Sequence, residues 1–192
     1  MGIPKRKEDQ LFTYSDYMTW PDDERWELID GEAYQMAPAS TNHQRVLRRL
    51  LNKFENYLEG KSCEVFDNLG VRLPGEDEPD EYIKDALIPD IAVVCDPEKL
   101  DDAGCKGAPD LIIEILSPST AAMDMKVKRF KYEIAGVKEY WIVDIPHKTV
   151  QIYKPGDNNK YGPPEVYTDE DKIKVGILED LEIDMSLVFA GI

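Results

Sequence analysis

Long apolar runs are missing from this sequence, and cysteine is scarce. No stretch approaches the length needed to cross a bilayer, and the basic residues 1–7 are not followed by the apolar core of a signal peptide. We therefore expect a cytoplasmic protein. The three cysteines, Cys63, Cys95 and Cys105, show no Cys-x-x-Cys spacing. Their number and spacing predict neither a disulfide framework nor a zinc site, and Cys95, in an apolar run, is expected to pack in the core.

Positive charge is also in short supply. The 192 residues include 23 Lys and Arg against 39 Asp and Glu, which gives a net charge of −16. Because tight non-specific binding to nucleic acid comes mostly from cations that neutralise phosphates, this balance argues against such a binder. The charge is uneven, however, and the plainest interpretation of each basic cluster is a solvated helix face. The basic clusters are Arg45, Arg48 and Arg49, and Lys126, Lys128, Arg129 and Lys131.

The chain lacks internal repeats, low-complexity segments and linkers, and its length suits one domain over residues 1–192. The hydrophobic pattern predicts an α/β fold, in which helices flank a central mixed sheet, with an extra N-terminal hairpin and short C-terminal edge strands. The apolar runs at 88–95 and 111–116 are short and rich in β-branched residues, so they are expected to be strands buried on both faces. Other strands are expected at about 63–66, 71–73, 139–143 and 149–154.

Helices and turns are predicted from caps and spacing. Ser15 is expected to cap a short helix, and an Asp-Gly pair predicts the turn of a hairpin over 26–36. Ser40 or Thr41 is expected to cap a long helix, because apolar residues recur after it at helical spacing. A further helix is expected over 121–135. Its buried side is expected to carry Val127, Phe130 and Ile134.

Two acids stand where a purely structural account is awkward. Asp90 lies near the start of one central strand, and Glu114 lies inside the other. A carboxylate in an apolar strand is costly to bury unless it is paired, hydrogen-bonded or bound to metal. For Asp90 the alternative is a polar residue at a strand start after proline; no such alternative explains Glu114. If the two strands are adjacent, both carboxylates meet at one end of the pair, where hard oxygen ligands suit Mg²⁺ or Mn²⁺.

A cation is then wanted beside the carboxylates, to orient the attacking water or to balance negative charge. The helix that follows Glu114 offers Lys126, Lys128 and Lys131. Lys128 and Asp124 stand four residues apart, so an ordinary ion pair on one helix face is the alternative to a catalytic role for this lysine.

Several segments together resemble the Uma-two family, a domain of unknown function whose bacterial members are classed as restriction endonucleases of the PD-(D/E)XK nuclease superfamily. The resemblance covers about residues 12–155, in the family's order. Its most specific part is the combination of EILSPST with AGVxEYW; Pro-Asp alone would carry no weight. The segments are 28–32 (LIDGE), 89–90 (PD), 110–120 (DLIIEILSPST), and Lys128 followed by 132–141 (YEIAGVKEYW).

The resemblance implies a role for each matching residue. Asp90 corresponds to the metal-binding aspartate, and Glu114 to the second acid, with the Ile115 carbonyl as a further metal ligand. Lys128 corresponds to the family's catalytic lysine, and Glu32 to an outer acid of the early hairpin. One departure from the superfamily pattern matters: the lysine usually stands two residues after the second acid, where this chain has Leu116. The expectation therefore depends on a lysine reaching the site from the next helix, and Lys126 competes with Lys128.

Three functions follow. The leading expectation is a Mg²⁺- or Mn²⁺-dependent endonuclease that cleaves nucleic acid, DNA rather than RNA, as a homodimer, because cutting two strands symmetrically needs two sites. The rival is an inactive nuclease fold that serves as an interaction module, which the acidity favours. A metal-free small-molecule hydrolase ranks third, because Gly-x-Ser-x-Gly is absent and Ser117 has no identifiable base nearby. For His43, at the start of the long helix, a surface position is favoured over the alternative, a place near the cleft.

Overall fold

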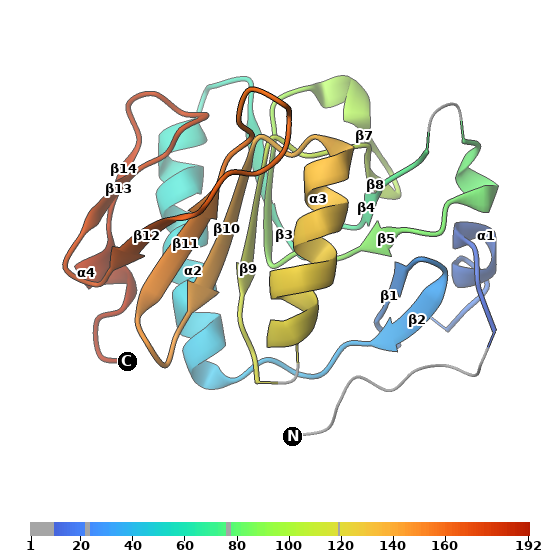
Figure 1. Cartoon of the computed structure of the whole chain (residues 1–192), viewed down its shortest axis with the longest axis horizontal. Coiled ribbons are helices and arrows are strands. Elements are labelled where there is room, and N and C mark those ends of the chain that lie inside the picture. The colour runs from blue at the N-terminus through green and yellow to red at the C-terminus, as the bar shows by residue number, and fades with distance from the viewer. Residues whose placement is uncertain (1–9, 22–23, 76–77, 119) are drawn as a thin grey trace.

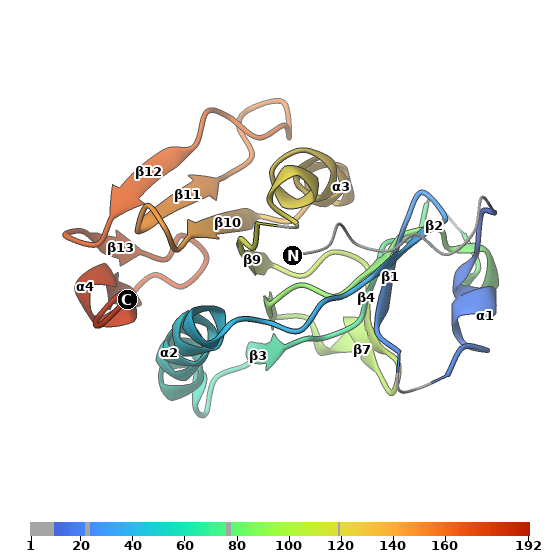
Figure 2. The same ribbon diagram turned by 90° about the horizontal axis from the view of Figure 1, so that it is seen from below.

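A computed structural model of the chain describes residues 10–21, 24–75, 78–118 and 120–192. Two six-stranded sheets dominate it, and the helices α2 (Thr41–Leu58) and α3 (Arg129–Ala135) cover opposite faces of the first, central sheet (Figures 1 and 2). The expected mixed sheet flanked by helices is therefore confirmed. Within the described ranges, no helix is both long and apolar enough to pass through a membrane.

The central sheet is mixed. Its β9 and β10 run parallel, whereas its other neighbouring strands are antiparallel. In spatial order its strands are β12 (Glu165–Thr168), β11 (Thr149–Tyr153), β10 (Glu139–Asp144), β9 (Leu111–Ile115), β6 (Ile91–Val94) and β3 (Glu64–Asp67). The β6 and β9 strands are buried at every position, as their continuous apolar runs predict.

The early hairpin is part of a second sheet rather than a mere addition to the first. Asp30 and Gly31 both have positive φ, 53° and 79°, as a two-residue hairpin turn requires. Of the run expected as one strand over 88–95, only β6 (Ile91–Val94) is a strand, because residues 88–90 carry the chain from β5 (Ala86–Leu87) of the second sheet to the first. The second sheet contains β2 (Glu32–Gln35), β1 (Trp26–Ile29), β5 (Ala86–Leu87), β4 (Val71–Arg72), β8 (Gly104–Lys106) and β7 (Leu100–Asp101).

Both N-terminal helices begin at a capping side chain. Ser40 caps α2 by accepting a hydrogen bond from the His43 amide at 3.2 Å, which confirms one of the two expected caps. The cap expected for the first helix is wrong: α1 (Tyr14–Tyr17) begins after Thr13, which forms a capping box with Asp16. Short 3₁₀ turns occur at Asp80–Tyr82 and Pro97–Lys99.

The helix after β9 differs most from expectation. Its first part, Met123–Lys128, is a π-helix, and α3 continues it to Ala135. Phe130 and Ile134, expected on the buried side, are 54% and 67% exposed. The inward face carries two polar residues that line a cavity, and Tyr132, which packs against the apolar face of the central sheet. The buried residues of this face are Asp124, Lys128 and Tyr132.

The C-terminal part contributes more than edge strands. A small sheet of β13 (Lys172–Lys174) and β14 (Glu182–Asp184) leads into the helix α4 (Met185–Val188). Together they close the core between α2 and the central sheet. The buried residues they add are Ile173, Val175, Leu178, Leu181, Ile183, Met185, Val188 and Phe189.

The cysteines also correct the sequence-based expectation. Cys63 and Cys95 form a disulfide. Their neighbours Glu64 and Val94 face each other in the antiparallel pair of β3 and β6, so the next residues outward lie side by side. Cys95 is therefore not a simple core residue, whereas Cys105 is free and buried.

Candidate active site

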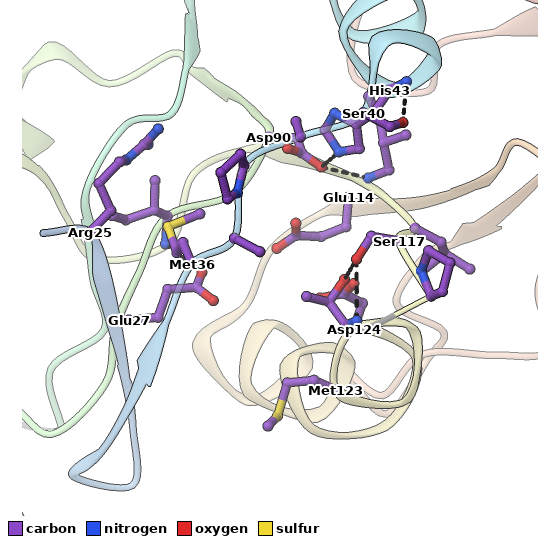
Figure 3. A pocket seen from close by; sticks show the side chains of 18 of the residues that line it. Arg25, Glu27, Met36, Ser40, His43, Asp90, Glu114, Ser117, Met123 and Asp124 are labelled. Atoms are coloured by element: carbon purple, nitrogen blue, oxygen red, sulfur yellow. Dashed lines mark hydrogen bonds and ion pairs between the residues drawn. The ribbon is translucent and has the colours of Figure 1, made fainter. Parts of the chain in front are cut away.

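A cavity of about 850 Å³ opens where the two sheets meet (Figure 3). Its walls come from the hairpin, the extended segment 36–40, the start of α2, the end of β9 and the π-helix. Asp90, Glu114 and Lys128, which the sequence places far apart, all line it. Concave sites with a few convergent polar groups are the usual place for ligands and chemistry.

Adjacent strands bring the two expected acids together. In the β6–β9 pair, Ile91 faces Ile113, so the register places Asp90 level with Glu114 at one end of the sheet. The sequence-based condition that the two strands be neighbours is therefore met. Both side chains point toward the same space in Figure 3.

Asp90 is bound through one carboxylate oxygen. Its Oδ2 accepts a hydrogen bond from the Ile115 amide at 2.8 Å and lies 3.2 Å from Nε2 of His43. Among the described residues, no donor bonds Oδ1. The carboxylate is therefore held through Oδ2, and Oδ1 accepts no hydrogen bond from the described residues.

Glu114 repeats this arrangement in a more buried position. Its Oε1 accepts hydrogen bonds from Nζ of Lys128 and from the hydroxyl of Tyr132, both at 3.1 Å. No group in the described part of the chain donates to Oε2. Burial raises the pKa of Glu114 well above its ordinary value, although the charge of Lys128 opposes this shift.

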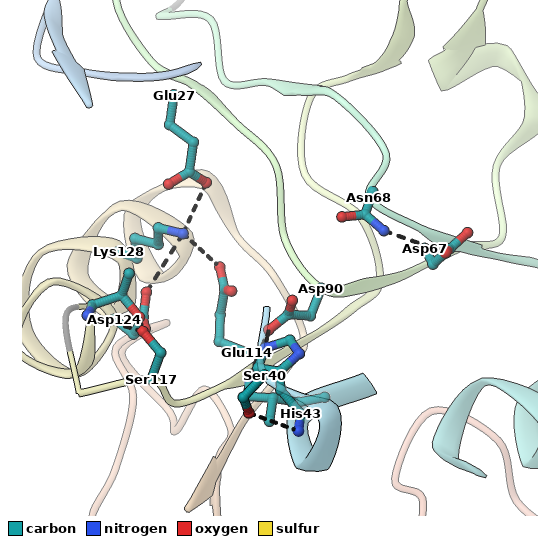
Figure 4. A network of polar contacts seen from close by, with 12 residues as sticks. Glu27, Ser40, His43, Asp67, Asn68, Asp90, Glu114, Ser117, Asp124 and Lys128 are labelled. Atoms are coloured by element: carbon teal, nitrogen blue, oxygen red, sulfur yellow. Dashed lines mark hydrogen bonds and ion pairs between the residues drawn. The ribbon is translucent and has the colours of Figure 1, made fainter. Parts of the chain in front are cut away.

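Lys128 lies between three carboxylates (Figure 4). Its Nζ is 2.8 Å from Glu27, 3.1 Å from Glu114 and 3.4 Å from Asp124. Burial alone would lower the pKa of Lys128, but these three acids outweigh it and raise that pKa well above the ordinary value. The ion pair with Asp124, which was one of the two alternatives weighed from the sequence, is present alongside the contact with Glu114, and the catalytic role of Lys128 stays a prediction. Lys126 is exposed.

The hairpin acid at this cluster is Glu27, which the sequence analysis did not select. It occupies a strand buried at all four positions, so the signal that identified Glu114, a carboxylate in an apolar strand, applied to Glu27 as well. The expected hairpin acid, Glu32, does not line the cavity. Its carboxylate accepts a hydrogen bond at 2.5 Å from the hydroxyl of Tyr34, which does.

The expectation for His43 is wrong. The residue is 8% exposed and lines the cavity, because the start of α2 lies against the start of β6. Burial would lower the pKa of His43, but the hydrogen bond and the charge of Asp90 outweigh it and raise that pKa above the ordinary value.

Acidic side chains outnumber basic ones in this cluster. Glu27, Glu114 and Asp124 contact the ammonium of Lys128, and Asp90 lines the same cavity, so four carboxylates share it with this lysine. Burial raises the pKa of Asp124, and its Oδ1 is buried without a hydrogen-bond partner in the described ranges. Close carboxylates repel unless a cation lies between them.

Side chains alone do not enclose an ion here. No group of three or more His, Cys, Asp or Glu residues could hold a metal among the residues that the structure describes. A bound ion would complete its shell with main-chain, water or substrate oxygens, as Mg²⁺ commonly does when only one or two carboxylates hold it. The Ile115 amide bonds Asp90, and a role for its carbonyl as a ligand stays a prediction.

Comparisons with known proteins agree with this fold. A family model described as "Putative restriction endonuclease" (Uma2) matches residues 14–186. An uncharacterized protein of Synechocystis sp. is 28% identical over 150 residues, covering 76% of this chain and 75% of its own. Another from the same organism is 30% identical over 138 residues, covering 70% and 75%. A crystal structure from Anabaena variabilis, titled "a putative nuclease belonging to DUF820", matches with a TM-score of 0.75 at 18% identity, covering 93% of this chain and 98% of that one.

Proposed function

Because the chain belongs to the Uma2 family of nuclease-like proteins, we propose that it is a Mg²⁺- or Mn²⁺-dependent endonuclease that hydrolyses phosphodiester bonds of DNA. One observation carries the proposal. Asp90 and Glu114 each have one oxygen held by neighbours and one uncommitted, and they lie side by side in the same cavity. This is the arrangement that a pair of metal-binding carboxylates needs before the ion arrives.

Asp90 and Glu114 would hold the ion, with the Ile115 carbonyl as a third ligand. A divalent cation in this position supplies activated water and stabilises charge on the phosphate under attack. The chain's own contribution is to fix the two carboxylates and to exclude competing water by burying Glu114 and Lys128.

Lys128 would act as a cation and not as a base. Three carboxylates keep its ammonium protonated, so it has no lone pair with which to accept a proton at neutral pH. Its hydrogen bonds to Glu27 and Glu114 fix the ammonium where it can stabilise negative charge that develops on the substrate.

The finer details are also proposals. DNA is favoured over RNA by the kind of nuclease that the family model describes. A homodimer is proposed because symmetric cleavage of two strands needs two sites, and light scattering at twice the 22.0 kDa of one chain would support it. A cytoplasmic location is proposed as well, and fractionation of cells that express a tagged chain tests it.

Metal binding and cleavage test the proposal together. Isothermal calorimetry with Mn²⁺ is expected to show binding by the wild-type chain and none by Asp90→Asn. Glu114→Gln is expected to abolish Mg²⁺-dependent cleavage of plasmid DNA while circular dichroism shows a folded chain. Matched RNA in the same assay separates the two nucleic acids. A wild-type chain that binds neither ion and cuts neither polymer would refute the proposal.

The net charge of −16 favours a second candidate, a nuclease fold that has become an interaction module. The two candidate functions differ in whether the protein binds a divalent cation. The module predicts no uptake of Mg²⁺ or Mn²⁺ in calorimetry, and no loss of uptake in Asp90→Ala.

A further inference from the structure

The buried His43 has no part in the roles described above. We propose that His43 is a positioning residue that holds the Asp90 carboxylate so that Oδ1 faces the divalent cation, an inference that rests on the proposed function. The carrying contact is 3.2 Å between Nε2 of His43 and Oδ2 of Asp90, shown as a dashed line in Figure 4.

The direction of this hydrogen bond follows from the chemistry of the two groups. An ionised carboxylate only accepts, so Nε2 carries the hydrogen and His43 is the donor. The other ring nitrogen, Nδ1, is buried without a hydrogen-bond partner in the described part of the chain. The bond to Asp90 therefore compensates for burial of the ring.

The imidazole is itself held in place. His43 is the third residue of α2, and its amide is bonded to the Ser40 cap. The helix that follows is anchored by fully buried side chains, including Val46, Leu50 and Phe54. A side chain at this end of a long, packed helix points in a fixed direction, as a positioning group must.

Asp90 needs such a support. It follows Pro89 at the crossing between the two sheets, just before β6 begins, so regular strand pairing does not fix its side chain. Its carboxylate has two partners in the described ranges, and both bond Oδ2. With the imidazole removed, the Ile115 amide alone holds it, and rotation about its side-chain bonds would exchange the two oxygens.

Metal affinity is the first test, with a matched control in the chain's second histidine. His43→Leu removes the donor, whereas His43→Gln retains an N–H near the place of Nε2. Calorimetry is expected to show Mn²⁺ affinity weakened roughly 10- to 100-fold in His43→Leu and within about threefold of wild type in His43→Gln. His147 forms a comparable pair with Asp144 at 2.9 Å on the exposed surface, so His147→Leu should leave the affinity unchanged.

A second readout needs no metal. The Ile115 amide donates to the same oxygen, Oδ2, that His43 holds, so its proton resonance reports the position of the carboxylate. In metal-free protein this resonance should keep its wild-type position in His43→Gln and move upfield in His43→Leu. If His43→Leu does not fold, His43→Asn replaces it, since its amide is one methylene too short to reach.

The outcomes separate this inference from the proposed function. If the wild-type chain does not bind Mn²⁺, the proposed function is overturned. The position of the Ile115 amide resonance in the variants still shows whether His43 positions Asp90. Equal Mn²⁺ affinity in the wild type and in His43→Leu would overturn the inference. So would an unmoved Ile115 resonance, or an equal loss in the Gln and Leu variants.

Discussion

Glu27 and Lys128 are 101 positions apart in the sequence, yet their side chains meet at 2.8 Å in the interior. The contact joins the hairpin of the second sheet to the helix that covers the central one. A second junction lies beside it, where Lys131 bonds Asp30 and Asp85. The position of the lysine at the candidate site therefore depends on both sheets at once.

Replacing Glu27 tests this junction. Glu27→Gln removes one of the charges that hold the ammonium of Lys128, and cleavage is expected to fall about 10- to 100-fold. Because Glu27 contacts the lysine and not the uncommitted oxygens of Asp90 and Glu114, Mn²⁺ affinity should change less than threefold. Glu32→Gln, on the same hairpin, should have the smaller effect on cleavage; the reverse order would contradict the assignment of Glu27.

Cleavage assays on two variants test whether Lys128 or Lys126 is the lysine of the site. Lys128→Met should lower cleavage by roughly 10²- to 10³-fold, since it removes the cation beside Glu114. It should also destabilise the fold by about 3 kcal/mol, because buried carboxylates lose their partner. Lys126→Met is the control, and we expect near wild-type cleavage and denaturation midpoint from this exposed position.

The disulfide predicts a dependence on reductant. In oxidised protein, Cys63 and Cys95 should resist alkylation, and reduction should lower the free energy of unfolding by about 4 kcal/mol, as expected for a crosslink between residues 32 apart. The double variant Cys63→Ser/Cys95→Ser should show no further response to reductant. Cys105 should stay unlabelled in the native state, because burial raises the pKa of its thiol to about 11.

Asp110 predicts a pH-dependent stability. Burial would raise the pKa of Asp110, but hydrogen bonds from Lys138 at 2.7 Å and from the Cys95 amide at 2.8 Å outweigh it and lower that pKa below its ordinary 3.8. A carboxyl with a depressed folded-state pKa stabilises the fold above its unfolded pKa, and the contribution is lost as pH falls through the folded value.

Asp110→Asn should therefore cost about 1–3 kcal/mol at pH 7 in urea denaturation. The difference from wild type should shrink as the pH falls below about 4. Asp180→Asn, at an exposed position, is the control and should follow the wild-type curve. A difference that stays constant from pH 7 to pH 3 would contradict the assignment.

The sequence predicted the central strands and the acids on them because both signals are local. A carboxylate inside an apolar strand is anomalous whatever the rest of the chain does, which is how Glu114 was found and how Glu27 could have been. The long helix was equally readable from its spacing and its Ser40 cap.

The wrong predictions concern residues whose burial or pairing depends on contacts with segments distant in the sequence. His43 has polar neighbours in the sequence, and only the crossing of α2 against β6 buries it. Phe130 and Ile134 were expected to face inward from a regular helical period, which the π-helix shifts, so that Asp124 and Lys128 face the cavity instead. The disulfide depends on the register between β3 and β6, which no spacing of cysteines reveals.

The disulfide and the histidine together bind α2 to a single strand at both ends. At the start of the helix, His43 contacts Asp90, which immediately precedes β6. Beyond the end of the helix, Cys63 is covalently joined to Cys95, which immediately follows β6. Reduction of the disulfide frees the C-terminal end of the helix, and the contact between His43 and Asp90 then holds only its N-terminal end. The thiol state of the protein should thus influence how firmly the Asp90 carboxylate is supported, although no cysteine lines the cavity.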